Sequence, residues 1–202
     1  IHRAGDDIAH RFGQILNAHQ VIINIAKVDA ALAVDHAKFV AAQPVDHFAL
    51  RVENAPGAPF SNSENFYKTS IELSRKHGVG NHTHLAQSPE DTQQMLAALG
   101  EKPVVWAERV GWVGPDVWYA HATRLSPTEK AIIQRTGTGI CHCPTSNMYT
   151  SASICEVAPM LQAGGFKIGL GVDGSAANNS SHLLKEARHA LLLQRTAFGA
   201  DA

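Results

Sequence analysis

The chain has 202 residues, of which 45% are hydrophobic and 17% are charged, and its formal net charge is −1. This composition is typical of a globular protein with one sizeable core. The near-neutral charge excludes the usual signature of nucleic-acid or anionic-membrane binding, and no apolar run reaches the length of a membrane span. Three cysteines without a framework spacing, together with no signal-peptide pattern, predict reduced thiols and a cytoplasmic protein.

Residues 1–49 differ from the rest of the chain and are left as an unassigned N-terminal segment. Apolar spacing predicts helices over residues 6–18 and 30–42, and Pro44 ends the second one. The histidines of this segment are scattered, so we expect them to be solvated. We therefore predict a mostly helical segment without chemistry of its own.

From about residue 50 to residue 202, strand-like runs alternate with helix-like segments. Helix starts are indicated at Ser61 or Ser63, and by Ser-Pro pairs at Ser88 and Ser126 that are followed by acidic residues. Ser61 with Glu64 fits a capping box. Strands are predicted near residues 48–52, 79–85, 117–120, 138–143 and 166–172. Alternation of this kind predicts an α/β fold with a parallel sheet, either an open doubly wound sheet or a barrel.

Polar side chains follow the predicted strands where each strand ends. They are the His82-Thr83-His84 run, His121, the Cys141-His142-Cys143 run and Asp173. Because the carboxyl ends of parallel strands in a barrel open on one mouth, a barrel would bring these side chains together, and we favour it for that reason. Histidines and an aspartate in that position are typical of a metal-hydrolase site.

Each of these residues also has a plainer interpretation. His82 and His84 lie two apart on a strand, so they supply two ligands, one ligand and one packed histidine, or none. His121 alone is more often structural. Asp173 ends an apolar run, where a charge is costly unless it meets a cation or several donors. Taken together, His84, His121 and Asp173 favour a metal site.

The Cys141-His142-Cys143 run is not predicted to bind metal. Cys141 and Cys143 share one strand face and His142 takes the other, and the sequence has no second cysteine pair of the kind a structural zinc requires. The H-x-E with P-C-x-x-C pattern of zinc base deaminases, the phosphate-loop and dinucleotide fingerprints, and the G-x-S-x-G elbow are also absent.

Four motifs occur in a specific order between residues 50 and 202. They are His84-Leu85-Ala86, Val117-Trp118-Tyr119-Ala120-His121, His142-Cys143-Pro144-Thr145-Ser146-Asn147 and the run from Gly171 to Ser180. In order and spacing they resemble the amidohydrolase superfamily, in its cyclic deaminase and chlorohydrolase branch and particularly its 8-oxoguanine and isoxanthopterin deaminase group. The resemblance implies a (β/α)8 TIM barrel, of which the C-terminal part, strands four to eight, is recognisable here.

The resemblance also implies an activity, namely hydrolytic deamination of an amino-substituted purine, pterin or related N-heterocycle. His84 and Asp173 would bind one divalent metal, most often zinc and in some relatives iron. Metal-bound hydroxide would attack the ring carbon that carries the amino group, with His121 and Asp173 as catalytic residues. Gly57, in the loop after strand four, and Trp112 are the candidate substrate-binding residues. A homo-oligomer is left open.

Three departures from the family pattern qualify this interpretation. The H-x-H pair that the family carries on strand one has no counterpart before residue 82, and Gly57 replaces a larger polar residue. Gln87 stands where relatives carry a proton-shuttling glutamate. Glutamine does no acid–base chemistry, so this change would cost about 10²–10⁴-fold in rate.

Three readings follow from these departures. We favour a chain that represents part of a complete deaminase, because the remaining strand ends are well kept and a half-barrel alone would expose strand edges. The second is a catalytically impaired relative that acts as a binding or scaffold protein. The third is an enzyme that removes chloride or an alkylamine from a triazine.

Overall fold

The computed structural model describes residues 19–20, 50–51 and 53–202, so the helices predicted over residues 6–18 and 30–42 lie outside the described residues. A four-stranded parallel sheet, with strand order β3-β4-β5-β6, forms the centre of the described part. Its strands are β3 (Asn81–Leu85), β4 (Val117–His121), β5 (Gly139–His142) and β6 (Lys167–Leu170). Two short strands, β1 (His19–Gln20) and β2 (Leu50–Arg51), pair in parallel with each other.

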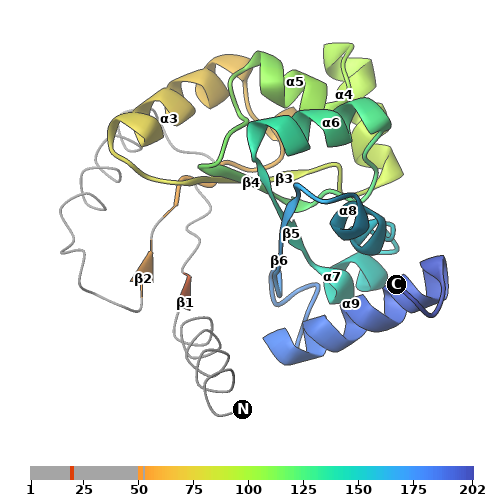
Figure 1. The fold of residues 1–202 in the computed structure, drawn as a ribbon. Coiled ribbons are helices and arrows are strands. Elements are labelled where there is room, and N and C mark those ends of the chain that lie inside the picture. The colour runs from red at the N-terminus through yellow and green to blue at the C-terminus, as the bar shows by residue number, and fades with distance from the viewer. Residues whose placement is uncertain (1–18, 21–49, 52) are drawn as a thin grey trace, which may run out of the picture.

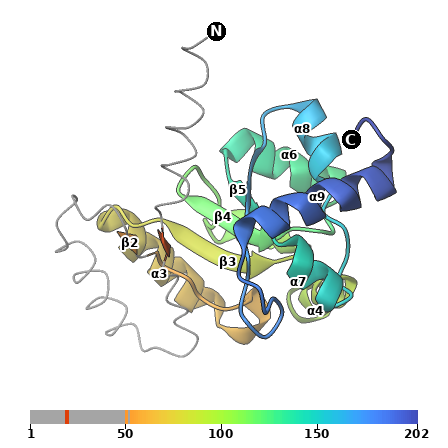
Figure 2. The ribbon, with the colours of Figure 1, turned by 90° about the horizontal axis from the view of Figure 1, so that it is seen from below.

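Helical segments connect the strands. They are η1 (Pro59–Ser61), α3 (Glu64–Lys76), α4 (Pro89–Leu99), α5 (Pro103–Arg109), α6 (Pro127–Thr136), α7 (Pro144–Tyr149), α8 (Val157–Ala163) and α9 (Leu183–Phe198). The sheet turns progressively from β3 to β6, and the helices lie along its outer side (Figures 1 and 2). Since a doubly wound sheet carries helices on both faces, this arrangement is that of a barrel segment, as predicted.

The helix starts read from the sequence are largely confirmed, with one correction. Ser88 and Ser126 each form a capping box with the acid three residues later. At α3 the cap is Ser63, whose hydroxyl accepts from the Phe66 amide at 3.2 Å. The predicted Ser61–Glu64 box does not form, because Ser61 ends η1 and its hydroxyl donates to the carbonyl of Ala58.

The main core lies between the outer face of the sheet and helices α3, α5 and α6. Large side chains fill it, notably Tyr67, Trp106, Trp112, Tyr119 and Ile133. Three aromatic rings meet edge to face, with centroids 5.0 Å apart for Tyr67 and Trp106 and 4.8 Å apart for Tyr67 and Trp112. None of the helices among the described residues has both the length and the hydropathy of a membrane span.

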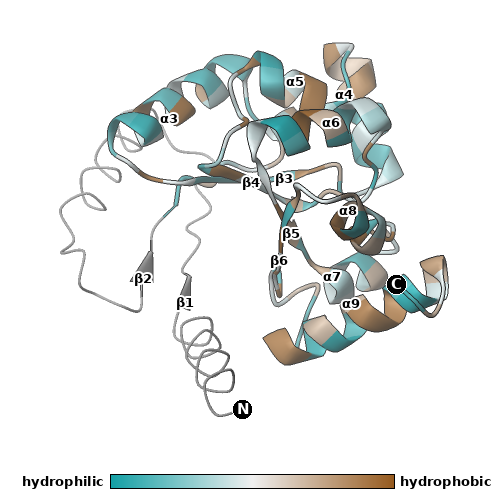
Figure 3. Ribbon diagram, in the orientation of Figure 1, coloured by the Kyte–Doolittle hydropathy of each residue, from teal (hydrophilic) through white to brown (hydrophobic). Residues whose placement is uncertain are grey.

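Helix α9 packs differently from the others. Its buried residues are Glu186 and Gln194, whereas Leu184, Leu191 and Leu192 remain exposed. Figure 3 shows that hydrophobic and hydrophilic residues alternate along α9. The helix is therefore held to the rest of the protein partly by polar contacts rather than by an apolar stripe alone.

Candidate metal centre

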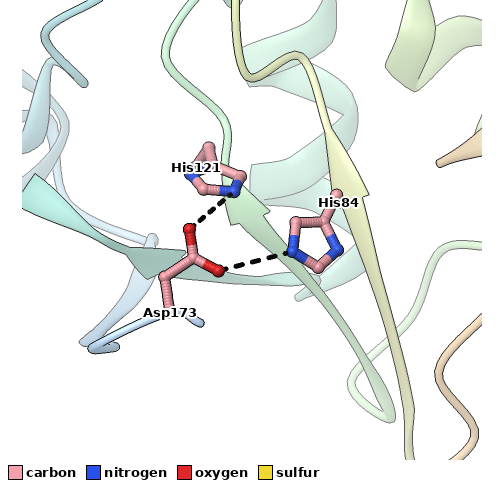
Figure 4. Close-up of side chains that lie close together, drawn as sticks. All are labelled: His84, His121 and Asp173. Atoms are coloured by element: carbon pink, nitrogen blue, oxygen red, sulfur yellow. Dashed lines mark ion pairs between the residues drawn. The ribbon is translucent and has the colours of Figure 1, made fainter. Parts of the chain in front are cut away.

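Three of the predicted residues come together at the carboxyl edge of the sheet. His84 lies near the end of β3, His121 ends β4, and Asp173 follows β6 (Figure 4). One Asp173 oxygen lies 3.7 Å from Nε2 of His84, and the other lies 3.8 Å from Nε2 of His121. One ligand atom from each residue falls within 4.8 Å of the others. We call this group the His-His-Asp cluster.

The cluster has the dimensions of a metal site. In a tetrahedral zinc site, bonds of about 2.0–2.2 Å place neighbouring ligand atoms about 3.4 Å apart, slightly closer than the distances here. His121 is fully buried, and its Nε2 has no hydrogen-bond partner among the described residues. A buried nitrogen that lacks a partner is costly unless something binds it. The residues present therefore fit a divalent metal.

The backbone around the cluster is strained. His121 and Asp173 have φ values of 71° and 60°, and Ala86 and Ala122 have φ values of 50° and 46°. Such left-handed residues cost about 1–2 kcal/mol each and occur where a site over-determines the backbone. The loops after β3 and β4 hold each other in place, because the Thr123 amide donates to the Ala86 carbonyl at 2.9 Å.

Helix α7 supports two members of the cluster. The Ser146 hydroxyl donates to Asp173, whose other oxygen accepts from the Gly174 amide at 2.7 Å. Nδ1 of His121 lies 2.8 Å from Oδ1 of Asn147. Since the amide oxygen is an acceptor, Nδ1 carries the proton and Nε2 presents its lone pair to the cluster.

The charges of the cluster suit metal binding. The neighbouring His84 imidazole, with donation from Ser146 and Gly174, holds the pKa of the Asp173 carboxyl well below its ordinary value. Burial, reinforced by His84, lowers the pKa of His121 to about 4. At neutral pH the carboxylate is thus ionised and His121 is neutral, which are the forms that ligate metals.

His82 stays outside the cluster. Its ring packs against Trp118 and His84, with centroids 5.4 Å and 5.5 Å away. Burial lowers its pKa to about 3, which keeps it neutral. Of the alternatives for the His82-Thr83-His84 run, the geometry favours one ligand and one packed histidine.

The two candidate substrate-binding residues have structural contacts. The Gly57 carbonyl accepts from the Tyr67 hydroxyl and from Thr83 Oγ1, the latter at 3.0 Å, so this carbonyl is turned towards the core. Trp112 is fully buried and donates from Nε1 to the Tyr67 carbonyl at 2.6 Å. Their role in substrate binding stays a prediction that these contacts do not support.

Gln87 follows β3 immediately beyond the cluster. Its backbone carbonyl accepts from Thr123 Oγ1 at 2.7 Å, which ties the two neighbouring loops together. Its side chain is half-buried. The position predicted for the proton shuttle thus lies three residues after His84, and the residue there is an amide.

The cysteines do not take part in the cluster. A Cβ on Gly171 would lie 2.5 Å from Sγ of Cys141 and 3.1 Å from Sγ of Cys143, so both sulfurs lie beside Gly171, which directly follows β6. His142 is buried apart from them. Among the described residues, only His84, His121 and Asp173 form a group of three ligand side chains.

Ser146 and Asn147 were not singled out as functional residues by the sequence. Pro144, a typical first helical residue, begins α7 directly after β5. That signal places the polar residues that follow it, among them Ser146 and Asn147, at the carboxyl edge of the sheet. It does not indicate which ligand each would contact.

Comparison with known proteins gives a consistent result. The model of the family described as "Amidohydrolase family" matches residues 17–202. An 8-oxoguanine deaminase from Pseudomonas aeruginosa is 41% identical over 156 residues, which cover 77% of this chain and 34% of that protein. A hydroxydechloroatrazine ethylaminohydrolase from Pseudomonas sp. (strain ADP) is 40% identical over 148 residues, covering 73% of this chain and 30% of that protein. The chain spans about a third of the length of these relatives.

Solved structures resemble the chain in fold. An adenosine deaminase from Xanthomonas campestris with bound zinc superposes with a TM-score of 0.77 at 22% identity, covering 88% of this chain and 41% of that one. A triazine hydrolase from Arthrobacter aurescens gives a TM-score of 0.77 at 24% identity, covering 86% and 38%. At these identities the likeness concerns the fold alone, which is that of a TIM-barrel segment.

Proposed function

Because this chain belongs to the amidohydrolase family, we propose that it is the metal-binding C-terminal part of an enzyme that hydrolytically deaminates an amino-substituted purine, pterin or related N-heterocycle. The observation that carries the proposal is the convergence of His84, His121 and Asp173 on one small volume. Relatives named 8-oxoguanine deaminase and isoxanthopterin deaminase support the substrate class.

Each residue of the cluster would have a separate role, which follows from the chemistry of its side chain. His84 Nε2 and the Asp173 carboxylate would hold a divalent metal, zinc in the first instance. Such a metal, when bound, lowers the pKa of water towards neutrality and polarises the substrate. The Asp173 carboxylate, kept ionised by its neighbours, is ready to accept a proton.

His121 has the features of a group that orients the reacting water. Its Nδ1–H is engaged by Asn147, and its neutral Nε2 faces Asp173 across 3.8 Å. A hydrogen bond from water to Nε2 would aim an oxygen lone pair at the ring carbon of the substrate. When charge develops during attack, a protonated His121 would stabilise it.

Gln87 limits which residues can transfer protons during the reaction. The amide cannot carry a proton from water to a ring nitrogen, so in this chain Asp173 and His121 would carry the proton steps. Gln87 would hydrogen-bond the substrate instead. Gln87 is therefore the observation that favours a second candidate function, that of a binding protein with reduced catalytic competence.

Another candidate is the removal of an alkylamine from a triazine. The relative named hydroxydechloroatrazine ethylaminohydrolase is 40% identical, about as similar as the 8-oxoguanine deaminase. Both reactions replace a nitrogen substituent on an aromatic ring with oxygen, and the same cluster serves either one. The products distinguish them, because one releases ammonia and the other an alkylamine.

The test is metal content followed by substrate profiling of the purified protein. We expect about one divalent metal per chain, and release of ammonia from amino-substituted purines or pterins. Release of ethylamine from an ethylamino-triazine, without ammonia from the purines, would replace the proposed substrate class. A protein that binds metal and these rings but turns over none of them would establish the binding role. A protein without metal affinity would overturn the proposal.

A further inference from the structure

A buried carboxylate outside the cluster calls for an explanation. Glu186 on α9 has no exposed surface, although leucines on the same helix stay in solvent. Burying a charge is costly unless several donors surround it. Oε1 of Glu186 accepts from Thr145 Oγ1 at 2.7 Å and from Asn178 Nδ2 at 2.8 Å, and Oε2 accepts from the Thr145 amide at 3.0 Å.

Two of these three donors, the hydroxyl and the backbone amide, belong to Thr145 at the start of α7. The N-cap of α7 is Cys143, whose side chain makes no capping hydrogen bond, so the first amides of this helix need another acceptor. Glu186 supplies it from α9. His189, one turn further along α9, lies with Nδ1 2.7 Å from Thr145 Oγ1 and donates to it, because that hydroxyl donates its own proton to Glu186.

The remaining donor, the side-chain amide of Asn178, belongs to the loop that follows Asp173. The backbone amide of Asn178 donates to the Gly174 carbonyl at 3.0 Å, which folds residues 174–178 into a compact turn. Asn178 Oδ1 accepts from the Ser180 amide at 3.2 Å. The side-chain amide of Asn178 then fastens this turn to Glu186.

The contacts of Glu186 are connected to the cluster in two ways, through α7 and through the loop that follows Asp173. Thr145 is followed directly by Ser146, which donates to Asp173, and by Asn147, which pairs with His121. Asn178 lies five residues after Asp173 in the same loop. We propose that Glu186 is a positioning residue, which sets the geometry of Asp173 and His121 by holding α7 and the Asp173 loop together. This inference rests on the proposed function, because it concerns the same metal centre.

A second polar residue on α9 offers a matched control. Gln194 is also buried, accepts from the Ala158 amide at 2.9 Å and donates to the Cys155 carbonyl at 2.9 Å. It thus anchors α9 to α8 as Glu186 anchors it to α7. Within the described part of the chain, Gln194 forms no hydrogen bond with α7 or with the Asp173 loop.

The experiment compares Glu186→Met with Gln194→Met in the purified protein. Zinc affinity is measured by competition with a chromogenic chelator, and Co²⁺ absorption reports the geometry of the ligands. We expect both variants to lose thermal stability, because each leaves backbone groups unpaired. Only Glu186→Met should weaken zinc binding, by about 10–100-fold, and alter the Co²⁺ spectrum.

A milder variant covers the case in which Glu186→Met does not fold. Thr145→Val removes one donor to Glu186 and keeps the backbone contact, so zinc binding should weaken several-fold with the fold intact. Unchanged zinc affinity in the folded variants, or an equal loss in Gln194→Met, would overturn the role of Glu186 alone. A wild-type protein that binds no zinc would overturn the proposed function and this inference with it.

Discussion

The core beneath α3, α5 and α6 and the carboxyl edge of the sheet are built in opposite ways. In the core, large side chains such as Tyr67 and Trp106 are fully buried in regular secondary structure. At the edge, His121 and Asp173 adopt left-handed backbone conformations, and a buried nitrogen lacks a partner. Stability is thus concentrated in one region. The other region contains backbone strain and a buried nitrogen that a bound ligand would satisfy.

The largest effect is expected from Asp173→Asn. Loss of the anionic side chain should weaken zinc binding by more than the roughly 100-fold upper range typical of changes to residues around the ligands, and should abolish the proposed deaminase activity. The metal-free protein should also lose some stability at neutral pH, because the folded state favours the ionised form of the Asp173 carboxyl. The measurements are zinc content and thermal unfolding of the metal-free protein.

Asp116→Asn is the control for this variant. Asp116 pairs with Arg75 at 2.9 Å on the surface and forms no hydrogen bond or ion pair with the cluster in the described structure. Its zinc content should equal that of the wild type. Normal zinc binding in Asp173→Asn would instead show that the metal is held elsewhere.

Trp112→Ala should have the opposite profile. Removing a fully buried indole costs about 3–5 kcal/mol in the free energy of unfolding, while the folded protein should keep its zinc affinity. Denaturant unfolding and chelator competition measure the two quantities. A raised KM with little loss of stability would instead assign Trp112 the substrate contact predicted from the sequence.

Gln87→Glu tests the carboxyl edge of the sheet by a gain, rather than a loss, of catalytic activity. If the rest of the site is complete, restoring a carboxylate should raise the deamination rate towards the lower end of the 10²–10⁴-fold range for general acid–base catalysis. Steady-state kinetics on the best aminated purine or pterin test this. An unchanged rate with zinc bound would mean that another group already moves the proton.

The smallest effect concerns pH. His142 is fully buried, neither ring nitrogen has a partner among the described residues, and burial lowers its pKa to about 4 from an ordinary 6.5. Since the unfolded chain binds the proton first, His142 makes stability fall as pH drops from about 6.5 to about 4. Unfolding free energy should therefore decrease across this window.

His142→Leu should flatten that decrease in part, because other buried histidines contribute as well. The exposed His182→Gln serves as the control, and its unfolding curve should follow pH as the wild type does. An unchanged pH dependence in His142→Leu would place the acid sensitivity in other groups.

The sequence predicts the strands and the cluster well, because both follow from simple periodicity. Apolar runs that end in His84, His121 or Asp173 need only a parallel sheet to bring the three residues together. Helix α7 is harder to predict, since six residues are too few for a helical pattern to emerge. Glu186 is harder still, because a lone glutamate among leucines is usually solvated, and only the packing of α9 against α7 reverses that expectation.

Helix α7 contacts the His-His-Asp cluster through two residues that are neighbours in the sequence, Ser146 and Asn147. Successive helical residues point about 100° apart, so Ser146 reaches Asp173 while Asn147 reaches His121. A small rotation of this one turn-and-a-half of helix would therefore disengage both side chains at once. Metal affinity and the orientation of the His121 imidazole are in this way mechanically coupled. Variants that shift α7 should impair both properties together. Variants that remove one contact, from Ser146 or from Asn147, should impair one property and spare the other.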